Sequence, residues 1–252
     1  MGTIVFVWKG RCGPFELDLS DHTFVPSTIS RLLADHLSVN PDDTVIDVGC
    51  GSGVLAIIAA KLGAGRVVGV DTTPDAAEVA TRNARRLGVA DVTTFYHGDL
   101  FDPLPRDLRA DLIIGDVSGI PDPVARVSGW FPDGTGGGPR GCELPIRMLE
   151  QVPDRLAPDG RVLLPTGSLQ DESVILTTAR SIFQRLTKLD ERRVPLSSAL
   201  SSAPELLRLA RDRVVDVTRR GSRLLFDVRI WECAQGHPDR ASSGSAPPIA
   251  DR

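Results

Sequence analysis

The run from Thr44 to Leu55 holds the residues whose types and spacing most clearly suggest ligand chemistry. An apolar, strand-like stretch contains Asp47, and Gly49, Gly51 and Gly53 follow at alternate positions before an apolar, helix-like stretch. Glycines at a strand-to-helix turn permit positive φ values and let a ligand approach the backbone. A carboxylate two residues before the turn repels a pyrophosphate and attracts a cation. The loop therefore favours a cofactor with positive charge, such as the ammonium and sulfonium groups of S-adenosylmethionine.

Two further acids follow along the chain at predicted strand ends. Asp71 ends the stretch 66–71, where a carboxylate can accept hydrogen bonds from ribose hydroxyls, and Thr72 beside it joins the cofactor-binding candidates. Asp99 follows the stretch 92–97, where it could hold the exocyclic amine of an adenine while Leu100 packs on the ring. The alternatives are a helix-capping role for Asp71 and a solvated loop position for Asp99.

Two residues are candidates for the catalytic step. Asp116 follows the stretch 111–115, at a strand end where such sheets open onto their ligands. It could accept a proton or hydrogen bond from an attacking amine or hydroxyl, or bind the ammonium of the cofactor. His22 precedes a predicted helix and has a side chain suited to proton transfer near neutral pH, although a surface-loop role is the alternative. The four scattered cysteines have no metal-ligand spacing, so we expect no metal.

The elements that must position these residues alternate between strand and helix. Strands are predicted at 44–48, 66–71, 92–97, 111–115 and 160–165, and helices at 53–63, 74–87, 143–157 and 170–184. This alternation predicts a parallel sheet with right-handed crossovers. After residue 185 the pattern changes to strands at 186–194 and 224–233 around a helix near 203–213. Two short strands and a helix beginning near Ser27 precede the whole series.

Together these motifs resemble the class I S-adenosylmethionine-dependent methyltransferases over residues 40–235. Asp47 with its three glycines is similar to the first motif of that family, Asp71 to its ribose acid, and Gly98-Asp99-Leu100 to its adenine contact. The resemblance implies S-adenosyl-L-methionine as cofactor. It also implies an α/β, Rossmann-like fold with a seven-stranded, mostly parallel sheet, an antiparallel last strand and helices on both faces.

Three regions are expected. Residues 1–40 form an N-terminal β-hairpin and a lid helix, and residues 41–235 form the cofactor-binding domain. Residues 236–252 are rich in Pro, Ser, Gly and Asp and are predicted to be a disordered tail. The glycine-rich loop 130–141 is either a substrate lid or a flexible excursion.

A narrower resemblance involves residues 111–120. They align with the segment that ends in Asn-Pro-Pro-Tyr in release-factor glutamine methyltransferases and adenine N6-methyltransferases. This chain has Asp116-Val117-Ser118-Gly119 in place of that motif. The change removes the aromatic ring that stacks on a planar amine, so neither glutamine nor adenine is carried over as the substrate.

Composition limits the partners. The chain has 252 residues, a net charge of −4 and 41% hydrophobic residues, so no overall positive field favours nucleic acid. No apolar run approaches the length of a membrane span, and no signal-peptide pattern is present, so we expect a cytoplasmic protein. The oligomeric state stays open.

The leading functional hypothesis is methyl transfer to an N or O nucleophile of a small molecule or peptide. A protein or RNA N-methyltransferase is one alternative, and a non-catalytic cofactor-binding module is another. An NAD-dependent oxidoreductase is a third, although its Gly-x-Gly-x-x-Gly turn would require the last glycine one residue later than Gly53.

Overall fold

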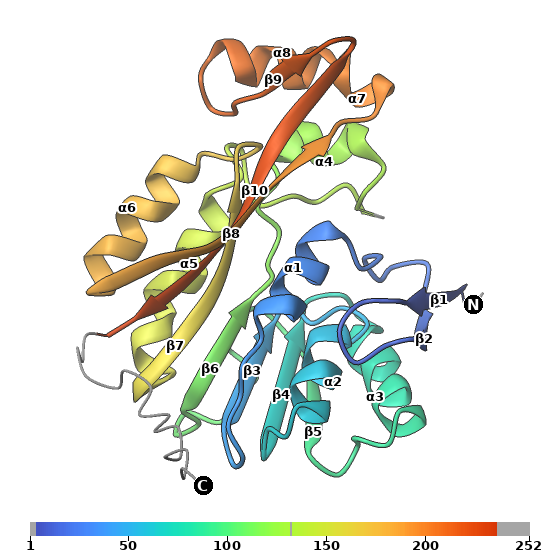
Figure 1. Cartoon of the computed structure of the whole chain (residues 1–252), viewed down its shortest axis with the longest axis vertical. Coiled ribbons are helices and arrows are strands. Elements are labelled where there is room, and N and C mark those ends of the chain that lie inside the picture. The colour runs from blue at the N-terminus through green and yellow to red at the C-terminus, as the bar shows by residue number, and fades with distance from the viewer. Residues whose placement is uncertain (1–3, 132, 236–252) are drawn as a thin grey trace, which may run out of the picture.

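A computed structural model describes residues 4–131 and 133–235 of the chain. Among these residues, a twisted eight-stranded sheet forms the centre of the molecule and a separate two-stranded sheet lies beside it (Figure 1). The strands are β1 (Ile4–Trp8), β2 (Phe15–Leu19), β3 (Thr44–Val48), β4 (Arg66–Asp71), β5 (Thr93–His97), β6 (Ala110–Gly115), β7 (Leu156–Gly167), β8 (Arg185–Pro195), β9 (Thr218–Arg220) and β10 (Arg223–Ala234). The helices are α1 (Thr28–His36), α2 (Val54–Lys61), α3 (Ala76–Arg86), α4 (Asp122–Ser128), α5 (Glu143–Gln151), α6 (Glu172–Ile182), α7 (Ser198–Ser201) and α8 (Pro204–Arg211).

The main sheet has the strand order β5-β4-β3-β6-β7-β10-β8. Strands β3 to β7 pair in parallel, whereas β10 runs antiparallel to both of its long neighbours, β7 and β8. The predicted fold, a mostly parallel sheet with an antiparallel last strand, is therefore confirmed. The short strand β9 adds an eighth member because it pairs with the start of β10.

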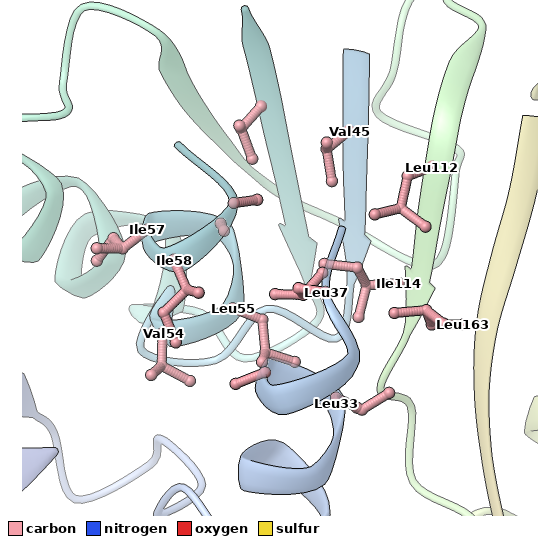
Figure 2. Packing of buried hydrophobic residues seen from close by; sticks show 14 of the residues in the cluster. Leu33, Leu37, Val45, Val54, Leu55, Ile57, Ile58, Leu112, Ile114 and Leu163 are labelled. Atoms are coloured by element: carbon pink, nitrogen blue, oxygen red, sulfur yellow. The ribbon is translucent and has the colours of Figure 1, made fainter. Parts of the chain in front are cut away.

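Each face of the sheet packs against its own set of helices. On one face, α1 and α2 bury Leu33, Leu37 and Leu55 against residues of the central strands such as Ile114, as Figure 2 shows. On the other face, α5 and α6 cover a second apolar cluster that includes Met148. The parallel strands are buried on both sides, which explains why their sequences are nearly continuous runs of Val, Ile and Leu.

The N-terminal hairpin and its helix are confirmed as elements. β1 pairs antiparallel with β2, and Ser27 begins α1 by accepting a hydrogen bond from the Ile29 amide at 3.1 Å. The side chain of Ser30 closes a capping box with the backbone of Ser27. Since Leu33 lies in the main core, α1 is an integral part of the helical layer that holds the sheet.

One local prediction was wrong, and one helix was not predicted. The helix predicted over 143–157 ends at Gln151, and β7 begins at Leu156 because that residue pairs with Ala110 of β6. The strand pairing outweighs the local helical pattern. Helix α4 was not predicted, because its seven residues lie between glycine- and proline-rich segments and Gly129, at φ 69°, ends it.

A third apolar cluster lies beyond the ends of the parallel strands. It joins Val124 of α4 and Leu169 to Leu206 of α8 and Leu224 of β10. In Figure 1, α7, α8 and β9 lie together above the sheet, at the end toward which the parallel strands point. We call this unit the cap subdomain, residues 196–225 with α4 packed beneath it.

The predicted tail, 236–252, lies outside the described residues. Among the helices of the described part of the chain, none has the length and apolar character needed to cross a bilayer.

Candidate functional site

The glycine loop joins the end of β3 to α2 and is held against the neighbouring strand. The amides of Gly49 and Cys50 both donate to the Val70 carbonyl oxygen, at 2.8 and 3.0 Å. The Gly51 amide donates to Asp71 Oδ2 at 2.8 Å. These hydrogen bonds fix the shape of the loop.

The three glycines are required for different reasons. All have positive φ values, of 81°, 50° and 81° for Gly49, Gly51 and Gly53. A Cβ atom at Gly49 would lie 2.5 Å from the Asp116 carbonyl oxygen, and one at Gly53 would lie 2.9 Å from Ala80 Cβ of α3. A Cβ atom at Gly51 would meet nothing within 4 Å. Gly51 thus faces open space, as the predicted ligand approach requires.

Asp71 lies where it was predicted, at the end of β4, and it organises two loops. One carboxylate oxygen accepts the Gly51 amide, and the other accepts the Thr73 amide at 2.8 Å. Each oxygen keeps a second lone pair for a ligand hydroxyl. The neighbouring Thr72 is exposed, and its carbonyl oxygen lies 3.0 Å from His97 Nε2.

Asp47 is fully buried beneath the loop. Its Oδ2 accepts the Ala56 amide at 3.0 Å, whereas Oδ1 has no hydrogen-bond partner among the described residues. Burial, together with the charges of Asp116 and Asp71, raises the pKa of Asp47 well above its usual range. The structure thus brings three acids from three adjacent strands into one cluster.

Asp116 follows β6 and is approached by the N-terminal helix. Ser30 of α1 donates to its Oδ2 at 3.4 Å. Desolvation raises the pKa of Asp116 to about 7, the Ser30 hydroxyl partly opposes this shift, and the charge of Asp71 adds to it. A carboxyl group that titrates near neutral pH is suited to exchange a proton during a reaction.

The adenine candidates lie at the end of β5. Leu100 is buried and has a φ of 47°, a conformation that fixes the turn after the strand. Asp99 is partly exposed and forms an ion pair with Arg147 of α5. The carboxylate of Asp99 thus has a protein partner but remains accessible to solvent, and its role toward a ligand stays a prediction.

His22 is the candidate that the structure does not bring to the acids. It is exposed, and its backbone amide donates to Ser20 Oγ at 3.2 Å in a tight turn. Among the described residues, its ring forms no hydrogen bond with the acid cluster.

The glycine-rich loop after α4 is fastened to the segment that follows Asp116. Asp122 Oδ1 accepts the amides of Gly136 and Gly138 at 3.0 and 3.2 Å, and the Gly137 amide donates to the Ile120 carbonyl oxygen at 2.7 Å. These contacts fasten residues 136–138 to the start of α4, and the role of the loop as a substrate lid stays a prediction. The earlier part of the loop meets the N-terminal segment through Phe131 and Phe24, whose ring centroids lie 5.2 Å apart.

Gln170 lies beside Gly119, the residue that stands where the related motif has tyrosine. A Cβ atom at Gly119 would overlap the amide of Gln170, which lies just after β7. An aromatic side chain cannot occupy this position unless Gln170 moves away.

Sequence reasoning missed Ser30, Arg147 and Gln170. Each of them lies far along the chain from the acid or turn that it contacts. Only the amphipathic pattern of α1, with Ser30 on its buried face, gave a signal for Ser30.

Residues 27–118 match the family model of ribosomal protein L11 methyltransferase (PrmA). The L11 methyltransferase of Pelotomaculum thermopropionicum is 38% identical over 149 residues, which are 59% of this chain and 39% of that protein. That of Tolumonas auensis is 42% identical over 86 residues, or 34% and 28% of the two chains. The chain thus spans less than half the length of these curated relatives.

Solved structures share the architecture. A T. thermophilus 16S rRNA N2 methyltransferase, determined with AdoMet and guanosine, has a TM-score of 0.60 at 14% identity and covers 93% of this chain and 51% of its own. Three observations support the same kind of protein. They are the parallel sheet with its antiparallel last strand, the acidic glycine loop and these matches. The chain has the fold of the class I S-adenosylmethionine-dependent methyltransferases, and residues 27–118 are similar in sequence to one family of these enzymes. At this level of identity the solved structures support the fold alone.

The comparison corrects one expectation. A small molecule or a peptide was predicted as the methyl acceptor, but the relatives are named for methylation of a whole ribosomal protein. They also differ from the glutamine- and adenine-methylating group that residues 111–120 resemble.

Proposed function

We propose that this chain binds S-adenosylmethionine and transfers its methyl group to a side-chain nitrogen of a protein, with a ribosomal protein as the acceptor. The observation that carries the proposal is the cluster of Asp47, Asp71 and Asp116 around a glycine loop that opens to solvent at Gly51. Three carboxyl groups in a partly desolvated site favour a ligand with positive charge and disfavour a diphosphate. The similarity to ribosomal protein L11 methyltransferases supports the acceptor class.

Each part of the cofactor has a corresponding group in the protein. The amino-acid portion would lie along the loop at Gly51, with its ammonium toward the acid cluster. The ribose would use the free lone pairs of Asp71 with Thr72 beside it, and the adenine would lie against Leu100 near Asp99. When bound, the cofactor supplies an electrophilic methyl group on a positive sulfur.

Asp116 is the residue that we assign to the acceptor. A protein amine is nucleophilic only after it loses its proton, and lysine has an ordinary pKa of about 10.4. A carboxylate with a pKa of about 7 accepts that proton more readily than one near 4. Asp116 also attracts the protonated amine during approach, so it would both orient the acceptor and deprotonate it.

Residues 1–40 are proposed to close the site above a cofactor domain formed by residues 41–235. Two contacts support this division of roles. Ser30 of α1 reaches Asp116, and Phe24 meets Phe131 from the loop after α4. Closure would exclude water from the transfer step.

The proposal is tested in two stages. Calorimetry with S-adenosylhomocysteine and, separately, with NAD identifies the cofactor. Purified ribosomal protein L11 is then incubated with the chain and S-adenosylmethionine carrying a radioactive methyl group, and mass spectrometry locates the label. We expect binding of S-adenosylhomocysteine alone and label on an amine nitrogen of the acceptor.

The outcomes separate the parts of the proposal. Binding of NAD in place of S-adenosylhomocysteine would overturn it altogether. Cofactor binding without label on L11 or on a mixture of ribosomal proteins would overturn the acceptor class and favour a non-catalytic module. The Asp116→Asn variant is the matched control, because it keeps the side-chain size and should bind the cofactor but transfer little label.

A further inference from the structure

An arginine-rich cavity lies where the cap subdomain adjoins the end of β8, and the proposed methyl transfer does not use it. The cavity has a volume of about 280 Å³ and is lined by Arg193 and Pro195 of β8, Arg220 of β9, and Arg223 and Leu225 of β10. Pockets for small molecules are mostly apolar and typically measure about 300–1,000 Å³. An open cavity in which three of five lining residues are arginines is better suited to part of a long, charged ligand.

Strand register fixes the arginines on one side of the sheet. Arg220 and Arg223 are direct cross-strand partners, and Leu225 pairs with Pro195. Side chains alternate along β10, so Leu224 and Val228 point into the core while Arg223 and Leu225 face outward. The backbone therefore places the side chains of Arg220 and Arg223 at opposite positions of one strand pair.

The positive charge of this pair is not balanced by protein carboxylates. Like charges directly opposite each other on adjacent strands are destabilising. Among the described residues, Arg220 and Arg223 form no ion pair, whereas Arg193 pairs with Asp227 at 2.9 Å and Asp227 also pairs with Arg229. Residues 204–223 contain six arginines and three acids in a chain with a net charge of −4. An anion between Arg220 and Arg223 would relieve their repulsion.

We propose that this cavity binds the phosphodiester backbone of RNA. A guanidinium group donates two parallel hydrogen bonds to a phosphate, and its planar shape reduces the entropy lost for each hydrogen bond formed. The lining strands β9 and the start of β10 lie at the end of the sheet toward which the parallel strands point, which is also the end that holds the acid cluster (Figure 1). The choice of RNA over an acidic peptide rests on the proposed function, because a ribosomal protein acceptor works in contact with RNA.

The test measures binding of a fluorescein-labelled single-stranded oligouridylate by anisotropy at several salt concentrations. The double variant Arg220→Gln/Arg223→Gln is compared with Arg85→Gln/Arg106→Gln, which removes the same charge from two exposed arginines without ion pairs among the described residues. We expect at least about tenfold weaker binding for the first variant. Its plot of log affinity against log salt should be shallower by about 1.4, from about 0.7 for each lost phosphate contact on a single strand. The control should lose less than threefold.

A charge reversal gives an independent readout. Arg220→Glu places opposite charges across the strand pair, so this variant should melt at a higher temperature than the wild type while losing RNA binding. Equal losses in both double variants, or a wild type that does not bind RNA at low salt, would overturn the proposal. Stronger binding of a labelled polyglutamate than of oligouridylate would assign the cavity to an acidic peptide instead.

Failure here is distinguishable from failure of the proposed function. Binding of S-adenosylhomocysteine and methylation of free L11 are measured on the same variants, and both should be unchanged in Arg220→Gln/Arg223→Gln. A wild type that binds RNA but not S-adenosylhomocysteine would leave the cavity assignment standing and remove the methyltransferase proposal.

Discussion

Asp116→Asn should stabilise the ligand-free protein, and the gain should grow with pH. The folded protein raises the pKa of Asp116 to about 7, from an ordinary value of 3.8. Between these values the folded state keeps a proton that the unfolded state has released, so the native state becomes progressively less stable as pH rises. Asparagine has the same shape, has no charge to desolvate and can still accept the hydrogen bond from Ser30.

The magnitude follows from the two pKa values. Each unit of difference corresponds to about 1.4 kcal/mol, so the variant should gain up to about 4 kcal/mol in free energy of unfolding at pH 8 and only about 0.6 kcal/mol at pH 4. The value at pH 8 is an upper bound, because the protein around the charged carboxylate relaxes and solvates it. We therefore expect a gain of roughly 2 kcal/mol in free energy of unfolding at pH 8. The gain should level off above pH 7, where the folded protein also releases the proton.

The measurement is urea unfolding followed by tryptophan fluorescence at pH 5, 6, 7 and 8, with equal m-values confirming comparable unfolding. Asp91→Asn, a change at an exposed acid, is the matched control and should not alter the dependence on pH. A stability difference for Asp116→Asn that is flat across this range would refute the assigned desolvation. A destabilised variant at pH 8 would show that the charge of Asp116 holds the fold together.

Three further predictions concern the loop and the lid. Asp71→Ala should weaken binding of S-adenosylhomocysteine by about 1–3 kcal/mol in calorimetry, and an unchanged affinity would remove Asp71 from the site. Gly49→Ala should lower the melting temperature more than Gly51→Ala does, because only the Cβ atom at position 49 would meet backbone atoms. Gly51→Ala should chiefly weaken cofactor binding. A larger loss of melting temperature for Gly51→Ala than for Gly49→Ala would mean that Gly51 does not face the ligand. Leu33→Ala should cost about 2–5 kcal/mol in urea unfolding, since it empties a fully buried site shared by α1 and the sheet, and a loss below 1 kcal/mol would make α1 a detachable lid.

The sequence was sufficient for the sheet and the glycine turn because their signals are local. Strand runs of Val and Ile, a turn with glycines at fixed spacing, and acids at strand ends are all read within a few residues. The class of the fold followed from the alternation of these runs. The predicted ends of helices and strands were wrong where pairing with a distant strand sets the boundary. An example is Leu156, which pairs with Ala110 and so begins β7.

The sequence by itself determined that Asp47 precedes the glycine turn and that Asp71 and Asp116 lie at strand ends, whereas the tertiary structure made the three strands neighbours. Only the tertiary structure decided that Asp47 and Asp116 are desolvated, and this burial raises the pKa of both carboxyl groups. It also placed Ser30 against Asp116 and set Arg220 opposite Arg223. Such relations arise from packing and register between segments distant in sequence, and no local pattern records them.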